Sequence, residues 1–168
     1  SRRQAIHDLA RFNDQGVVDY LFGLVSVEVD AVLRHEAVLG LVKLRLSAQG
    51  LEFPMKPIRR RITEEVANYQ RIAAVTAILR RHNRHDISHN EHVLLLLRVL
   101  LEESVEQIFR LLMLLYRPED IHLIYEQLRQ SEPYVRADAI ELLANIVEPA
   151  MRTILFPIHE EENFLTIL

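Results

Sequence analysis

Hydrophobic residues recur along this chain at the three- and four-residue spacing of amphipathic α-helices, and no stretch shows the alternating polarity of a half-buried strand. Turn-forming residues, many of them Pro, Gly, Asn and Asp, separate the periodic stretches. We therefore expect an all-α chain of about seven or eight antiparallel helices joined by short turns. The spacing predicts helices over about residues 3–12, 17–25, 31–48, 58–81, 90–116, 120–130, 133–147 and 150–161.

Several helix ends carry local signals. Asp30 stands where it can cap the helix that follows, and Gly50 stands where a left-handed backbone conformation ends that helix. Residues 88–91 have the Ser-x-x-Glu form of a capping box.

The helix over 90–116 is apolar almost all round, which is typical of a helix buried on several sides. We therefore expect the core to include residues from this helix and from the helix over 133–147. They are Leu96, Leu100, Phe109, Leu112, Leu142, Leu143 and Ile146.

Composition narrows the class further. The chain has 168 residues, 49% of them hydrophobic and 26% charged, which is the balance of a soluble globular domain. Its net charge of −4 offers no global attraction to nucleic acid, so we expect no nucleic-acid partner. The absence of cysteine excludes disulfides and cysteine-ligated zinc, and no apolar run reaches the roughly 18 residues that a membrane span needs. Because residue 1 is not Met, we interpret residues 1–168 as a single domain of a longer protein.

Two segments share a pattern that suggests internal repetition. Val32–Val42 and Tyr134–Ala144 each place an aliphatic residue before an Arg, an Ala three residues later, and then paired aliphatic residues. The Arg can turn back to the preceding acidic turn, with Asp30 or Glu132 as its candidate partner. The alternative is an amphipathic helix that carries an Arg by chance.

The second of these segments resembles a known repeat. Ser131–Leu143 is similar to the second helix of a HEAT repeat, with its acidic-Pro-x-aliphatic-Arg-x-x-Ala signature. Phe109–Ile121 and Glu141–Val147 are similar to the HEAT-like region attached to bacterial membrane proteins of the ATP/ADP-translocase type, which add helical repeats to a major-facilitator-like transporter portion. The predicted helix over 58–81 departs from this pattern, because it is too long for a standard repeat unit.

The resemblance implies an armadillo-type α-solenoid, a right-handed superhelix that acts as a scaffold for protein partners or for other domains of the same chain. It also implies a cytoplasmic domain whose parent protein lies in the inner membrane. Nucleotide exchange would belong to the transmembrane part of such a parent, so no transport residue is assigned here. The apolar tail Phe164–Leu168 would favour a homodimer if it is exposed.

A histidine cluster is the first candidate for chemistry. Four of the eight histidines fall within eleven residues, and in one continuous helix they would share a face suited to zinc or nickel. The alternative is a solvated loop, because turn formers such as Asn83, Asp86 and Ser88 lie among them. The candidate metal ligands are His82, His85, His89 and His92.

Arginines at both ends of the helix over 58–81 form the second candidate. Cations at a helix N-terminus oppose the helix dipole, which favours a role in binding phosphate, acidic lipid headgroups or an acidic helix. An anion- or nucleotide-sensing domain is thus one alternative function, and a solvated face balanced by Glu52, Glu64 and Glu65 is the plain alternative. The candidate contact residues are Arg59, Arg60, Arg80, Arg81 and Arg84.

Catalytic signatures are missing from the sequence. It contains no Gly-rich phosphate loop, no Gly-x-Ser-x-Gly nucleophile motif and no His-Glu-x-x-His zinc motif, and only four glycines in all. We therefore expect a non-catalytic module without a cofactor, which functions in protein interaction or scaffolding.

Overall fold

The computed structural model describes residues 2–82 and 91–156, and these residues form eight α-helices and no strand. The all-α prediction is thus confirmed for this part of the chain, and the predicted helices are present with small shifts at their ends. Of the last predicted helix, over 150–161, only the first half is described. The helices are α1 (Arg2–Leu9), α2 (Gln15–Val27), α3 (Ala31–Ser47), α4 (Met55–His82), α5 (Glu91–Leu115), α6 (Pro118–Leu128), α7 (Pro133–Ile146) and α8 (Pro149–Leu155).

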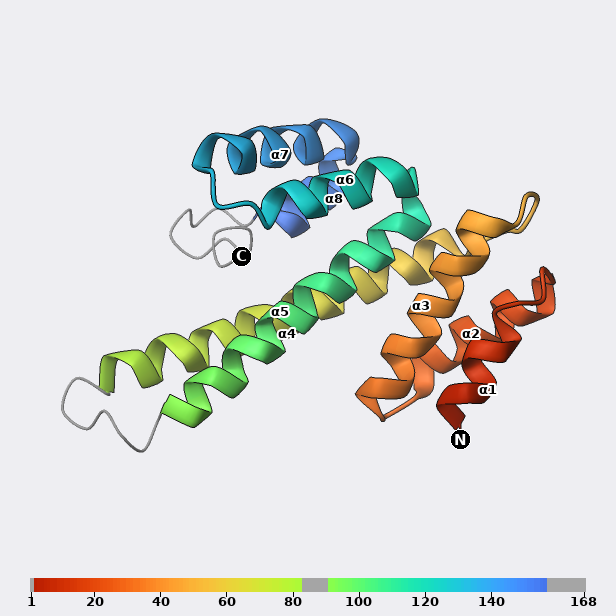
Figure 1. The fold of residues 1–168 in the computed structure, drawn as a ribbon, viewed down its shortest axis with the longest axis horizontal. Helices are drawn as coiled ribbons and strands as arrows, with labels where there is room; N and C mark the ends of the chain where they lie inside the picture. Colours follow the sequence, from red (N-terminus) through yellow and green to blue (C-terminus); the bar gives the residue numbers. More distant parts are fainter. Residues whose placement is uncertain (1, 83–90, 157–168) are drawn as a thin grey trace.

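The long helices α4 and α5 lie antiparallel and form the axis of the molecule (Figure 1). Helices α1, α2 and α3 pack on one side of the base of this hairpin, and α6, α7 and α8 pack on the other. The outer half of the hairpin contains the C-terminal half of α4 and the N-terminal half of α5. This half extends beyond both helical groups. None of the described helices is both long and apolar enough to cross a bilayer.

The core lies at the base of the hairpin. Ile62 and Tyr69 of α4 and Ile108 of α5 are fully buried there, and eleven of the fifteen α5 residues from Leu101 to Leu115 are buried. All eight helices contribute buried residues to one cluster. The hairpin thus joins the two helical groups through a single core.

Some of the predicted core residues are buried, and others are exposed. Phe109, Leu112 and Leu143 are buried as predicted, and the half-buried Ile146 packs against the core. The prediction is wrong for Leu96, Leu100 and Leu142, whose exposed fractions are 58%, 38% and 39%. Leu96 and Leu100 lie in the N-terminal half of α5, in the part of the hairpin that extends beyond both helical groups, and Leu142 lies in α7.

The predicted cap at Asp30 is confirmed, whereas Gly50 has the predicted left-handed conformation but does not end α3, which ends at Ser47 with an extended Ala48. The Asp30 carboxylate accepts hydrogen bonds from the backbone N–H groups of Val32 and Leu33, at 2.9 and 3.4 Å. Gly50 has a φ of +83°, a conformation that favours glycine. The capping box predicted at residues 88–91 lies outside the described residues, apart from Glu91.

Arg34 turns back to the preceding turn as predicted, but its partner differs. The guanidinium donates to the backbone oxygens of Glu28 and Val29, at 2.8 and 2.7 Å, and not to the Asp30 carboxylate. Asp30 is engaged in capping α3, whereas the two carbonyl groups have no helical partner of their own.

The order of helix packing bears on the predicted solenoid. A strictly sequential solenoid stacks each helical pair on the pair before it. Here α8 also contacts α4, so the last described helix returns to the middle of the chain. The α-solenoid and its superhelical sense therefore stay predictions.

The division of the hairpin into a buried base and an exposed outer half predicts unequal mutational costs. Leu112→Ala should lower the free energy of unfolding by about 2–5 kcal/mol, since it leaves a cavity in a fully buried site. Leu96→Ala should lower it by less than about 1 kcal/mol, because its side chain is more than half exposed. Urea denaturation measures both changes, and equal costs would contradict the described packing.

Candidate functional site

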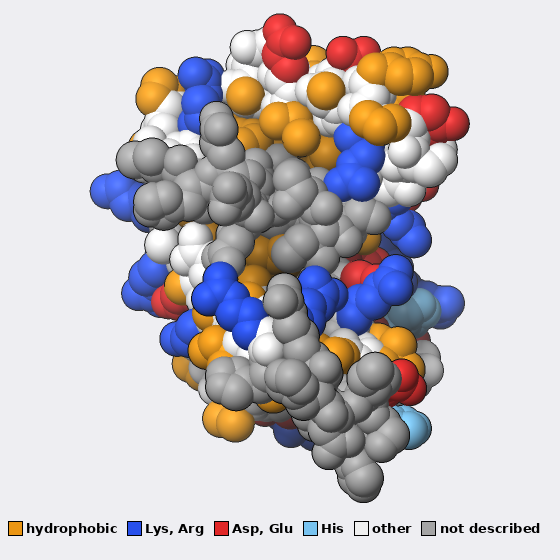
Figure 2. All heavy atoms as spheres, turned by 90° about the vertical axis from the view of Figure 1, so that its left-hand side faces the viewer, with side chains coloured by type: hydrophobic (Ala, Val, Ile, Leu, Met, Phe, Trp, Pro, Cys, Tyr) orange, Lys and Arg blue, Asp and Glu red, His pale blue; other side chains and the backbone are white. Residues whose placement is uncertain are grey.

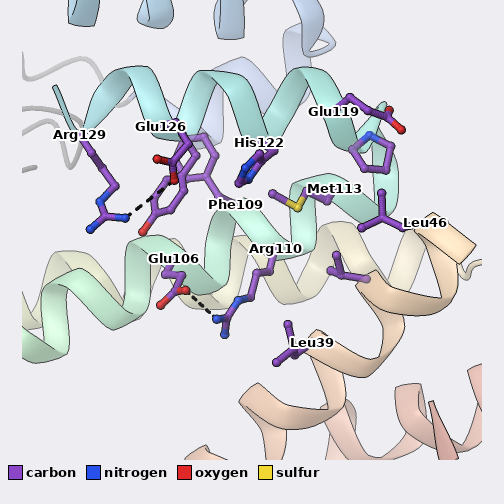
Figure 3. Close-up of a pocket in the computed structure, with 13 residues that line it drawn as sticks. Leu39, Leu46, Glu106, Phe109, Arg110, Met113, Glu119, His122, Glu126 and Arg129 are labelled. Carbon is purple, nitrogen blue, oxygen red and sulfur yellow. Dashed lines mark hydrogen bonds and ion pairs between the residues drawn. The ribbon is translucent and has the colours of Figure 1, made fainter. Parts of the chain in front are cut away.

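An open groove of about 430 Å³ lies between α3, α5 and α6 (Figure 3). Its floor is apolar and buried, with Val42, Phe109 and Met113 contributing side chains. Leu46 forms part of the wall and is 58% exposed. The remaining lining residues are Leu39, Glu106, Arg110, Pro118, Glu119, His122, Tyr125, Glu126 and Arg129.

Charged side chains of both signs surround the groove. The guanidinium of Arg110 donates to Glu106 at 2.6 Å, and Arg129 forms a longer ion pair with Glu126 at 3.9 Å (Figure 3). The Arg129 guanidinium also lies 5.6 Å from the centre of the Tyr125 ring. These four charges are therefore paired with one another within the rim.

Aromatic contact joins the floor of the groove to its α6 wall. The rings of Phe109 and Tyr125 are 5.0 Å apart between centres and tilted by 35°. Burial raises the pKa of the Tyr125 hydroxyl, and the nearby Glu106 carboxylate raises it further. Tyr125 is consequently a neutral hydrogen-bonding group at the edge of an apolar surface.

Helical periodicity explains how three separate segments build this groove. Leu39, Val42 and Leu46 recur at intervals of three and four residues, so they occupy one face of α3. Phe109 and Met113 are four residues apart on α5, and Pro118 begins α6 immediately after the turn that reverses the chain. Of the floor residues, only Phe109 is predicted from the sequence, as a core residue. The apolar stripe of Leu39, Val42 and Leu46 is visible in the sequence, but it does not distinguish a groove wall from a buried core face.

The candidate arginines do not converge on one site. Arg59 pairs with Glu148 at 2.8 Å and Arg60 with Glu64 at 3.6 Å. Arg80 and Arg81 are exposed at the other end of α4, about 30 Å away at 1.5 Å per residue. Arg84 lies outside the described residues. An anion sensor would need one groove lined by all these arginines. The described arginines do not form such a groove.

The Arg59 ion pair belongs to a junction between α4, the end of α5 and α8. Glu148, at the N-terminus of α8, accepts a hydrogen bond from the Tyr116 hydroxyl as well as the contact from Arg59. Burial raises the pKa of Tyr116 to about 12, with help from the Glu148 carboxylate. Burial alone would raise the pKa of Glu148, but the Tyr116 hydrogen bond and the Arg59 charge hold it below its ordinary value. Arg59 thus has a structural partner.

The histidine cluster is only partly described. His92 is exposed, while His85, His89 and the side chain of His82 lie outside the described residues. Among the residues that are described, no group of three or more His, Asp or Glu side chains could hold a metal ion. The metal site at these four histidines therefore stays a prediction.

Comparisons of the chain with protein-family models, curated proteins and solved structures find no match. The HEAT-like and translocase-type resemblances consequently stay predictions from the sequence.

The junction at Glu148 predicts a pH-dependent contribution to stability. Because the pKa of Glu148 is lower in the folded chain, its stabilisation is present above the ordinary pKa of 4.5 and is lost as the pH falls through the folded pKa. Glu148→Gln should lower the free energy of unfolding by about 1 kcal/mol at neutral pH, and by less as the pH falls below about 4.

Thermal denaturation of the unaltered chain and of Glu148→Gln, from neutral pH to below about pH 4, measures this difference in stability. Glu141→Gln, at an exposed position of α7, is the control. A loss for Glu148→Gln that persists undiminished at low pH, or an equal loss for the control, would contradict the role of the junction.

Proposed function

We propose that this chain is a non-catalytic protein-interaction module, a helical scaffold whose groove between α3, α5 and α6 binds an amphipathic helix of a partner. The observation that carries the proposal is the groove itself, with its buried apolar floor and its charged rim. Protein interfaces have the same anatomy, because an apolar anchor supplies affinity while rim charges supply orientation. Helix-in-groove recognition uses such a surface.

The rim favours a polypeptide over a small anion. Arg110 is paired with Glu106 and Arg129 with Glu126, so a phosphate would have to displace a carboxylate from each pair. A helix with apolar residues on one face and charges of both signs at its edges would leave these pairs intact. The open shape of the groove, between three helices, also fits an elongated partner.

The proposal extends, through the resemblance at residues 109–121 and 131–147, to a larger protein. On this account the chain is the cytoplasmic scaffold of a translocase-like parent in the inner membrane. The complete reading frame tests the extension, because about a dozen apolar spans of some 20 residues each would support it. A reading frame without such spans would contradict the extension and leave the groove proposal standing.

Selection of helical peptides against the chain tests the groove. We expect the selected peptides to carry apolar residues at intervals of three and four, and Leu46→Glu to weaken their binding at least about tenfold, since it places a charge in the apolar wall. Fluorescence polarisation measures the affinity of each peptide for each variant.

Tyr134→Glu provides the matched control. Tyr134 is an exposed aromatic residue of α7 that does not line the groove, so its replacement should leave peptide affinity unchanged. Both variants alter exposed side chains and should keep the helical circular-dichroism spectrum. Peptides that bind Leu46→Glu as tightly as the unaltered chain would contradict the proposed function.

A further inference from the structure

The outer hairpin, defined as residues 71–82 of α4 and 91–100 of α5, exposes an unusual amount of apolar surface. Seven large aliphatic side chains there are each at least 38% exposed. Isolated exposed aliphatic residues are ordinary, but seven of them within two short segments that lie side by side indicate a surface that binds something. The seven are Val75, Ile78, Val93, Leu95, Leu96, Val99 and Leu100.

This apolar surface is broad. At 100° per residue, the five exposed aliphatic residues of α5 cover an arc of about 160°. The side of α5 that faces α4 includes the buried Leu101, and further along α5 the Ser104 hydroxyl donates to the backbone oxygen of Glu65 in α4. A single partner helix would cover a narrower seam. The breadth therefore favours contact with an extended apolar medium.

The charge of the outer hairpin opposes that of the whole chain. It carries four arginines, at 71, 80, 81 and 98, against the single Glu91, whereas the chain has a net charge of −4. Arg98 pairs with Glu102 at 2.9 Å, but Arg71, Arg80 and Arg81 form no ion pair with any described residue. Figure 2, which faces the free end of the hairpin, shows Lys and Arg side chains (blue) among hydrophobic ones (orange).

We propose that the outer hairpin binds the surface of an anionic lipid bilayer. Its aliphatic side chains would enter the boundary between headgroups and acyl chains, while its arginines extend their long stems to reach the lipid phosphates. The combination of a wide apolar face with excess positive charge is that of interfacial helices, and anionic lipids attract each nearby Arg.

The other occupants fit less well. Two outer hairpins facing each other in a homodimer would bring two positively charged surfaces together, which disfavours their association. An acidic protein helix would satisfy the arginines but would leave part of the broad apolar arc in water. The outer hairpin also shares no residue with the groove, so this inference is independent of the proposed function.

Single-tryptophan variants test where the bilayer contacts the chain, because the sequence contains no Trp. Leu96→Trp should show a blue shift in emission with vesicles of equimolar phosphatidylcholine and phosphatidylglycerol, and none with phosphatidylcholine alone. Leu123→Trp is the control, since Leu123 of α6 is 53% exposed but lies outside the hairpin. Its emission should stay unchanged with either vesicle.

Charge variants test the role of the arginines in the same vesicles by co-sedimentation. Arg80→Gln combined with Arg81→Gln should weaken vesicle binding about 10- to 30-fold, because it removes the attraction of two cations to the anionic surface. Arg11→Gln combined with Lys56→Gln removes the same charge from exposed positions outside the outer hairpin and should leave binding unchanged. High salt should weaken the binding of the unaltered chain.

The proposal is overturned if the unaltered chain does not bind anionic vesicles, or if it binds neutral and anionic vesicles equally. It is also overturned if the chain sediments as a dimer that Leu96→Glu dissociates, a result that would assign the surface to a second copy. Leu46→Glu should leave vesicle binding unchanged, so failure of this inference and failure of the groove proposal are separable.

Discussion

The antiparallel packing of α4 against α5 is the constraint on which the rest of the structure depends. At the base of this hairpin, fully buried residues such as Ile62 and Ile108 join the helices, and both helical groups attach to the same segment. Hydrophobic burial there, at about 25 cal/mol per Å² of apolar area, supplies the main stabilisation. The outer hairpin continues the same two helices. Its aliphatic residues are exposed because no other described helix packs on them.

The groove and the Glu148 junction follow from this arrangement. Helices α3 and α6 belong to the two different groups, and each packs against α5, so a space remains between them that neither fills. The junction of Arg59, Tyr116 and Glu148 ties α8 to the start of α4 and thereby holds the second group against the base. Helix α6 packs against both α5 and α7, so the α6 wall of the groove belongs to the same packed core.

Local features were predictable from the sequence because they depend on few residues. The Asp30 cap, the positive φ of Gly50 and the Pro-initiated helices each require only neighbouring residues. The burial of Leu96 and Leu100 was predicted wrongly, because an apolar helix is buried only if another element covers it. The groove escaped prediction for a related reason, since Leu46 and Tyr125 come from helices far apart in the sequence. For the arginines, the sequence could not show that Arg59 meets Glu148, 89 positions further along the chain.

Amide hydrogen exchange, read by mass spectrometry with and without anionic vesicles, tests the central claim that one hairpin has a packed base and an unpacked outer half. In the free chain, amides of residues 71–82 and 91–100 should exchange faster than those of 58–70 and 101–115, because opening of uncovered helix requires less free energy. Anionic vesicles should slow exchange in the outer hairpin alone. Equal protection of both halves in the free chain, or vesicles that leave the outer hairpin unchanged, would contradict the account.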